Sequence, residues 1–127
     1  MSMSDYLETT LINHVLRGTS FSSPSSRYIA LYTSDPMDAN TGTEVTGGSY
    51  ARQTCTFAAP TNGVTSNAAI VSFPVATADW GTVTHFGIVS ALTGGNLWFS
   101  GTLSGPQAVG TDTQLQFLVG QLTVTLD

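Results

Sequence analysis

The run from Asp79 to Gly101 constrains the fold of this chain more than any other stretch, because it predicts a β-hairpin. Apolar and polar residues alternate on both sides of a central turn, which is the two-residue period of extended strands. The turn contains Gly94 and Gly95, which tolerate the positive φ of tight reversals. On the returning strand, Leu97 and Phe99 alternate with their neighbours and are expected on one face. A lone hairpin cannot bury its apolar face, so other strands must cover it.

The rest of the chain supplies such covering strands. We predict them over residues 27–34, 50–57, 64–73, 115–119 and 122–126, with Gly, Pro and Asn turns between them. The pair Gly105-Pro106 is expected to break the chain after the hairpin. Short strands at fairly regular spacing predict a mainly β fold, an antiparallel β-sandwich of jelly-roll or immunoglobulin-like type.

One α-helix is predicted before the β-region, over residues 5–17. Asp5 is the expected N-cap, Glu8 three positions later completes a capping-box pattern, and Gly18 can end the helix in a left-handed conformation. An apolar stripe at helical spacing includes Leu7, Leu11 and Val15.

This stripe has two interpretations. The favoured one packs it on the domain's own sheet, and the other docks it onto a neighbouring subunit. A Ser/Pro-rich linker follows over 19–26. The predicted organisation is therefore a helix over 1–18, which could act as an anchor, a linker over 19–26, and a β-sandwich domain over 27–127.

Composition limits the classes of partner. Charged residues make up 9% of the 127 residues, against roughly 25% in typical soluble domains. Such a surface costs little to desolvate and suits assembly with neighbours, although an ordinary Thr/Ser-rich β-domain fits equally well. The net charge of −5 argues against nucleic acid and anionic membranes, and no apolar run reaches the length of a membrane span. We expect no secretory signal, and synthesis in a cytoplasm.

Catalytic chemistry finds little support. His14 and His85 are the only imidazoles, and Asp79 could orient His85 in a small hydrolase, but no nucleophile elbow accompanies them. The lone Cys55 excludes an intrachain disulfide and is expected to be a small buried hydrophobe. We therefore expect no enzyme and no cofactor.

Two groups of residues could still bind a small ligand. Asp35, Asp38, Asn40 and Glu44 place oxygen atoms on one polar loop, but their spacing does not match an EF-hand, so no metal is expected. The aromatic residues Tyr50, Trp80 and Trp98 are either a stacking platform for a sugar ring or core packing, and core packing is favoured.

Five successive segments resemble a family of small tailed-bacteriophage virion proteins. They are IALYTSDP, TGTEVTGGSYARQ, FPVATADWGTVTHFGI, TGGNLWFSGTL and QFLVGQLTVTLD, and together they span residues 27–127. Members of this family are usually labelled phage tail-fibre proteins, and relatives of similar size are capsid decoration or cement proteins. The resemblance implies a virion protein, made in the host cytoplasm, without enzymatic activity.

Two virion roles follow from the resemblance. The first is a capsid decoration or cement subunit that stabilises the particle. The alternative is a tail-fibre, tail-tip or baseplate protein that recognises the host by binding glycans through Tyr50, Trp80 or Trp98. The expected partners are the major capsid protein or tail and baseplate proteins, and the expected state is a homo-oligomer, with a trimer favoured. The candidate partner contacts are Leu7, Leu11, Val15, Asp38 and Glu44.

Overall fold

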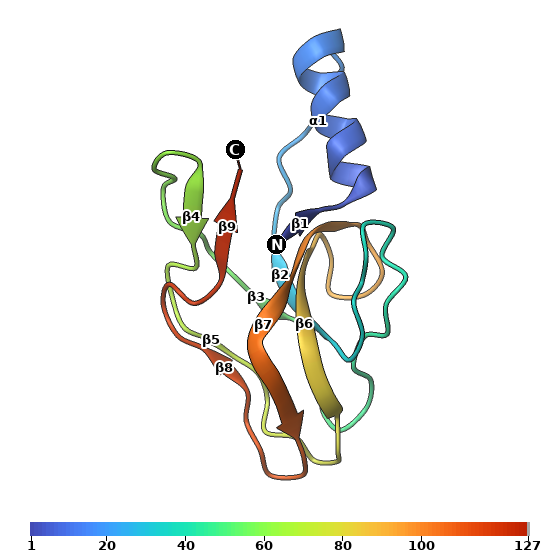
Figure 1. Cartoon of the computed structure of the whole chain (residues 1–127), viewed down its shortest axis with the longest axis vertical. Helices are drawn as coiled ribbons and strands as arrows, with labels where there is room; N and C mark the ends of the chain where they lie inside the picture. The colour runs from blue at the N-terminus through green and yellow to red at the C-terminus, as the bar shows by residue number, and fades with distance from the viewer. Residues whose placement is uncertain (127) are drawn as a thin grey trace.

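A five-stranded antiparallel sheet organises the computed structural model, which describes residues 1–126 (Figure 1). Residue 127, the last of the predicted β-domain, lies outside the described residues. The elements in chain order are β1 Ser2–Met3, α1 Asp5–Arg17, β2 Tyr28–Tyr32, β3 Gln53–Thr54, β4 Val64–Ser66, β5 Val71–Ser72, β6 Gly81–Val89, β7 Leu97–Val109, β8 Gln116–Phe117 and β9 Thr123–Thr125. The mainly β fold with one N-terminal helix is confirmed.

The predicted hairpin lies at the centre of this sheet. The strand order is β1-β7-β6-β2-β3, so β6 and β7 are flanked on both sides. Two short antiparallel ribbons, β4–β9 and β5–β8, lie to the left of the β6–β7 pair in Figure 1, and the long loop between β2 and β3 lies to the right. The hairpin is therefore covered by strands from the rest of the chain, as its apolar residues require.

Both faces of the sheet are buried at β2. Ile29 and Leu31 point into the main core, where they meet ribbon residues such as Val71 and Phe117. Ala30 and Tyr32 point the other way, into a smaller cluster with Val89 and Leu97. The main core gives the sandwich-like packing of sheet on ribbons.

β7 runs through the position where a break was expected. Val83 pairs with Gln107 and His85 with Thr102, so a two-residue step on β6 faces a five-residue step on β7. The extra residues form a bulge that contains Gly105-Pro106. A proline can sit in a strand at a bulge, because it need not donate a ladder hydrogen bond there.

A second irregularity at Trp98 corrects the predicted alternation. Ile88 pairs with Phe99, but the next residue, Val89, pairs with Leu97, so Trp98 is the extra residue of a bulge. Phe99 packs against the main core and Leu97 lies in the smaller cluster. The expectation that both lie on one face is wrong, because the bulge shifts the register by one residue.

The other predicted strands are shorter than expected. The strand over 50–57 is reduced to β3, and the strand over 64–73 is divided into β4 and β5. Asn67 lies between the two strands. Its fully buried side chain donates to the carbonyls of Ala69 and Leu118 at 2.9 Å and accepts from Leu122 N at 2.9 Å, so this buried polar group is fully paired with backbone groups.

The helix has the predicted bounds, but its cap differs. Ser4, not Asp5, is the N-cap: its Oγ accepts from Leu7 N at 3.2 Å, while its own amide donates to Trp98 O. Gly18 ends the helix with φ 70°, as predicted. Within residues 1–126, no helix has the length and apolar character needed to cross a membrane.

Candidate functional site

α1 projects from the β-body as a separate element (Figure 1). Leu7 is buried at its base, and Leu11 is half-buried. Farther along, Ile12, Val15 and Leu16 are 56%, 71% and 76% exposed. The helix therefore carries an apolar side that the described part of the chain does not cover, which we call the open face of α1 (Ile12, Val15 and Leu16).

The linker covers a different side of the helix. After Gly18 the chain turns back along α1, where His14 Nδ1 lies 2.9 Å from Thr19 O and the rings of His14 and Phe21 meet edge to face at 6.3 Å. Residues 19–22 face Tyr6, Thr10 and Asn13 of the helix. These positions are on the polar side, so the linker leaves the open face free.

The predicted contact Asp38 lies at the base of this helix. Ser2 Oγ donates to its carboxylate at 2.5 Å, and Asp5 N donates to its carbonyl at 3.0 Å. The structure thus places Asp38 next to the N-terminal end of α1, near Leu7. Whether Leu7, Leu11, Val15 and Asp38 contact a partner stays a prediction.

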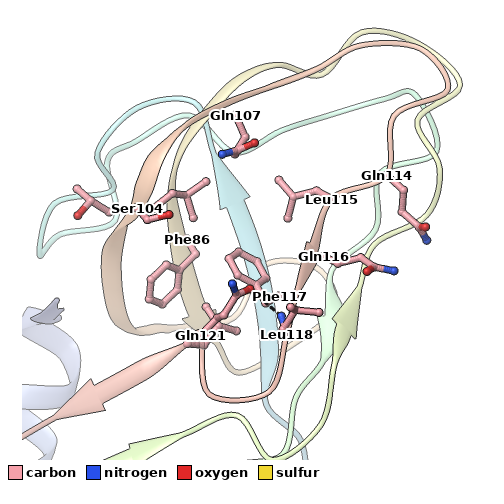
Figure 2. A pocket seen from close by; sticks show the side chains of 12 residues that line it. Phe86, Ser104, Gln107, Gln114, Leu115, Gln116, Phe117, Leu118 and Gln121 are labelled. Atoms are coloured by element: carbon pink, nitrogen blue, oxygen red, sulfur yellow. Dashed lines mark hydrogen bonds between the residues drawn. The ribbon is translucent and has the colours of Figure 1, made fainter.

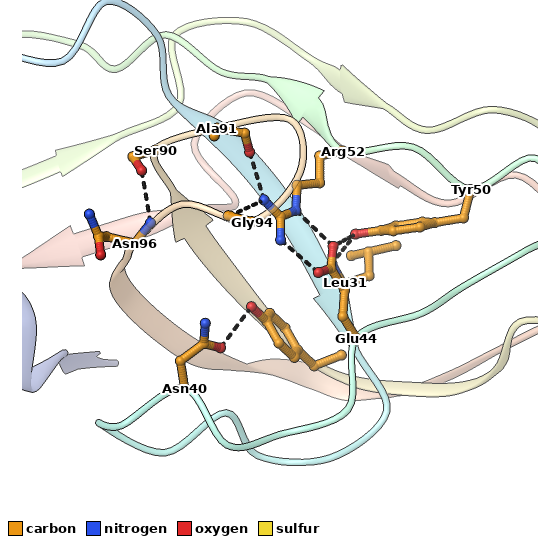
Figure 3. A network of polar contacts seen from close by, with 10 residues as sticks. Leu31, Asn40, Glu44, Tyr50, Arg52, Ser90, Ala91, Gly94 and Asn96 are labelled. Atoms are coloured by element: carbon orange, nitrogen blue, oxygen red, sulfur yellow. Dashed lines mark hydrogen bonds and ion pairs between the residues drawn. The ribbon is translucent and has the colours of Figure 1, made fainter.

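Glu44 lies elsewhere, in a polar network with Arg52 (Figure 3). Arg52 Nε and Nη2 donate to the two carboxylate oxygens of Glu44 at 2.8 and 2.7 Å. Its Nη1 donates to the carbonyls of Ala91 and Gly94, at 2.7 and 2.8 Å, in the turn between β6 and β7. Arg52 is 9% exposed. This network joins the loop that carries Glu44 to the β6–β7 turn. The guanidinium of Arg52 donates its hydrogen bonds to groups of the same chain.

Tyr50 completes the network and couples it to β2. Its hydroxyl donates to Glu44 Oε2 at 2.6 Å and accepts from Leu31 N at 3.0 Å. Burial alone would raise the pKa of Glu44, but the hydrogen bonds from Arg52 and Tyr50 outweigh it and the pKa is lowered. Burial and the bond to Glu44 raise the pKa of Tyr50. The glutamate is therefore held as an anion and the tyrosine as a neutral donor.

The three aromatic residues of the glycan hypothesis do not form one platform. Trp80 is 4% exposed, its Nε1 donates to Gly48 O at 2.8 Å, and its ring meets Tyr50 edge to face at 5.5 Å. Tyr50 also stacks on Phe73. Trp98 occupies the bulge of β7, where α1 begins. Glycan contact by these residues stays a prediction.

His85 and Asp79 are not brought together. His85 Nδ1 lies 2.8 Å from Thr84 Oγ1, and its Nε2 is 3.8 Å from Asp35 Oδ2. Asp79 accepts from Gly81 N at 2.8 Å, as a turn residue does. The proposed orientation of His85 by Asp79 is therefore wrong. Cys55 is buried, as expected, and burial raises the pKa of its thiol to about 11, so it stays protonated at neutral pH.

The oxygen-bearing side chains of the polar loop also have separate partners. Asp35 accepts from Met37 N at 2.9 Å, and Asn40 Oδ1 accepts from the hydroxyl of Tyr32 at 3.2 Å. Asp38 and Glu44 are engaged as described above. The side-chain oxygens of this loop accept hydrogen bonds from groups of the same chain.

Sequence reasoning missed a cleft between β7 and β8 (Figure 2), which we call the β7–β8 cleft. Its cavity volume is about 550 Å³. Phe86 and Phe117 form its floor, with ring centroids 6.2 Å apart. One wall comes from the long bulge of β7, and the other from β8 and the turn after it. The lining residues are Phe86, Thr102, Leu103, Ser104, Gln107, Gln114, Leu115, Gln116, Phe117, Leu118, Gln121 and Leu122.

One sequence signal could have pointed to this cleft. Four of the five glutamines of the chain, at 107, 114, 116 and 121, fall in one short segment near the C-terminal end. Only the fold brings that segment against Phe86, because a two-residue β8 gives no periodicity to extrapolate.

Comparison with family models gives a match over most of the chain. A family model described as "Podophage GP4 fiber I protein gp80" matches residues 2–125, which is nearly the whole chain. No curated protein matches.

Proposed function

The chain belongs to the podophage GP4 fiber I protein gp80 family, and on this basis we propose that it is a non-enzymatic structural subunit of a phage fibre. It is a virion component, and it associates with other components of the particle. The family description favours the tail-fibre hypothesis over the capsid decoration or cement role that the sequence placed first. In this proposal the protein acts at the fibre, with a role in host recognition.

The open face of α1 supports an assembly role for the helix. Ile12, Val15 and Leu16 are each more than half exposed, and full burial of one such side chain is worth roughly 1.5–3 kcal/mol. A helix that packed only on its own domain would turn this side inward. Residues 1–18 are proposed as the assembly element, 19–26 as the connection, and 27–127 as the body.

The proposed occupant of the open face is α1 of other copies of this chain. Ile12, Val15 and Leu16 follow the three- and four-residue spacing of helices that pack together in bundles. The linker lies on the polar side of the helix, so copies can approach from the apolar side. A closed homo-oligomer, with a trimer favoured, buries the same surface on every subunit.

The test replaces one exposed leucine on the helix and one elsewhere. Leu16→Glu puts a charge on the open face, and Leu92→Glu makes the same change at a leucine that is 56% exposed in the β6–β7 turn. We expect Leu16→Glu to give monomers by analytical ultracentrifugation and Leu92→Glu to keep the oligomer. Monomeric wild type at micromolar concentration, or an oligomer unaffected by Leu16→Glu, would contradict the proposed α1 contact.

The location in the particle needs a second experiment. Virions that carry a gold-labelled copy of this protein should show label at the fibres by electron microscopy. Label spread over the head would support capsid decoration instead, and absence from particles would reject both roles.

A further inference from the structure

We propose that α1 is folded only while the N-terminal arm is docked on β7, and that Ser4 couples these two events. The N-terminal arm is β1 and α1 together, residues 2–17. The inference rests on the proposed function, because it makes the open face of α1 available only in the docked state. It therefore describes how the assembly contact is regulated.

The helix has little stability of its own. It has 13 residues, and a helix of this length is marginal in water, where even alanine-rich sequences need about 12–15 residues. Its residues Thr9, Thr10, Ile12 and Val15 are β-branched, which lowers the helix propensity. Among the residues that the structure describes, Leu7 alone on α1 is buried. The helix therefore depends on the contacts at its base.

Ser4 makes both the contact with β7 and the cap of the helix. It is 2% exposed, its amide donates to Trp98 O at 2.8 Å, and its hydroxyl donates to Leu97 O. The same hydroxyl oxygen accepts from Leu7 N at 3.2 Å. A hydroxyl has one proton and two lone pairs. Because Leu97 O takes the proton, the lone pairs remain for Leu7 N, so docking orients the cap.

The loop between β2 and β3 holds the same end of the helix. Asp5 N donates to Asp38 O at 3.0 Å, and Ser2 Oγ donates to the carboxylate of Asp38. Asp5 N and Leu7 N are among the first amides of the helix, which have no acceptor inside it. Undocking takes the acceptor away from Asp5 N and frees the hydroxyl of Ser4. The first turn of α1 loses its support in the same step.

The other end of α1 gives no comparable support. There the helix contacts its own linker, through His14 Nδ1 and Thr19 O, and it projects away from the β-body (Figure 1). The side chains of Ile12, Val15 and Leu16 lie on one side only while the helix is formed. An undocked arm thus has no open face. By linkage, copies that bind through this face stabilise the docked arm.

Hydrogen exchange of the wild-type protein, followed by NMR, tests the coupling directly. The Ser4 amide reports docking, and the Leu11 amide reports the helix. We expect their protection factors to agree within about fivefold, and the amides of β2 to be protected at least about tenfold more. A larger difference between Ser4 and Leu11, or a smaller advantage for β2, would overturn the proposal.

Ser4→Asp separates coupling from simple capping. Aspartate caps helices as well as serine does, but its carboxylate has no proton to donate to Leu97 O. We expect the Leu11 amide to lose at least about tenfold of its protection. Ser25→Asp, at an exposed position of the linker, is the matched control and should leave that protection unaltered. A smaller loss in Ser4→Asp would show that Ser4 is only a cap. If this variant does not fold, the wild-type exchange data decide.

Leu16→Glu separates this inference from the proposed function. If copies assemble through the open face, the Ser4 amide should exchange at least about tenfold faster in this variant than in the wild-type oligomer. An oligomeric wild type without that increase would reject the regulation of assembly. A monomeric wild type would reject the proposed assembly, while the comparison of Ser4 with Leu11 would still decide the coupling.

Discussion

Arg52 and Glu44 form a two-point ion pair that closes two loops on each other, because the same guanidinium also binds two carbonyls of the β6–β7 turn. The side chains of Arg52 and Glu44 are 8% and 24% exposed. Removing the cation leaves the half-buried carboxylate of Glu44 uncompensated, with a hydrogen bond from Tyr50 remaining, and takes the donor away from the carbonyls of Ala91 and Gly94.

Arg52→Met should therefore be strongly destabilising. We expect a loss of about 3 kcal/mol in the free energy of unfolding, the order found when one partner of a buried pair is removed. Urea unfolding measures it. Arg27→Met is the matched control, because within residues 1–126 the side chain of Arg27 makes one long hydrogen bond, of 3.4 Å to Ser23 Oγ. The loss in this variant should stay within about 0.5 kcal/mol. Equal losses of unfolding free energy in the two variants would contradict a stabilising role for the Arg52 network.

The same pair predicts a pH dependence. The pKa of Glu44 is lowered in the folded state from 4.5. A carboxyl with a depressed folded pKa stabilises the protein above its unfolded pKa, and this stabilisation is lost as the pH falls through the folded pKa. The stability gap between wild type and Glu44→Gln should thus be widest at neutral pH and narrow below pH 4.5. A gap that stays constant from pH 7 to 3 would contradict this.

Asn67→Ala should destabilise the wall of the β7–β8 cleft. The change removes three side-chain hydrogen bonds: it leaves Leu122 N unpaired in the interior, and it takes the donor away from the carbonyls of Ala69 and Leu118, which belong to exposed residues. An unpaired buried group costs about 1–3 kcal/mol and each lost hydrogen bond adds to this, so we expect a loss of about 2 kcal/mol. Urea unfolding and faster hydrogen exchange at Leu122 N report it. Asn96→Ala, at an exposed position of the β6–β7 turn, is the control and should be nearly neutral.

Gly101→Ala should displace the Phe86 ring. The new Cβ would lie 2.8 Å from Cε1 of that buried ring, and such overpacking costs about 1–3 kcal/mol. Gly105→Ala is on the same strand with nothing within 4 Å of its added Cβ, so it should be near neutral. Urea unfolding compares the two. Phe86→Leu should recover part of the Gly101→Ala loss, and no recovery would argue against this contact.

The identity of the N-cap of α1 can also be tested. Ser4→Ala removes the oxygen that accepts from Leu7 N, and N-cap losses are typically about 1 kcal/mol. Asp5→Ala removes the residue that the sequence suggested as cap, and we expect a smaller effect because Asp5 lies inside the first turn. Thermal unfolding should rank Ser4→Ala as the less stable variant. The reverse order would restore Asp5 as the cap.

The sequence predicted the features that depend on local periodicity. The helix bounds, the left-handed Gly18 and the central hairpin follow from residue spacing, and the structure has all three. The bulges at Trp98 and before Gln107 were not predictable, because a bulge depends on which residues the partner strand offers.

Long-range side-chain bonds also escaped prediction. Asn67 falls inside the strand predicted over 64–73, yet its side chain is buried and bound to a segment about fifty positions away. Glu44 looked like a surface contact because its partner, Arg52, lies across a loop. The β7–β8 cleft likewise depends on a contact between residues far apart in the sequence, Phe86 and Phe117.

The attachment of α1 has a mechanical consequence. The helix enters the body through β1, which pairs with β7 at Ser2–Ser100 and Met3–Phe99, and its linker leaves into β2, which pairs with β6. Tension applied to α1 is therefore divided between two strands on opposite sides of the central hairpin. Any load carried through this helix would be transmitted into the most extensive ladder of the molecule, and the cleft beside β7 would be strained with it.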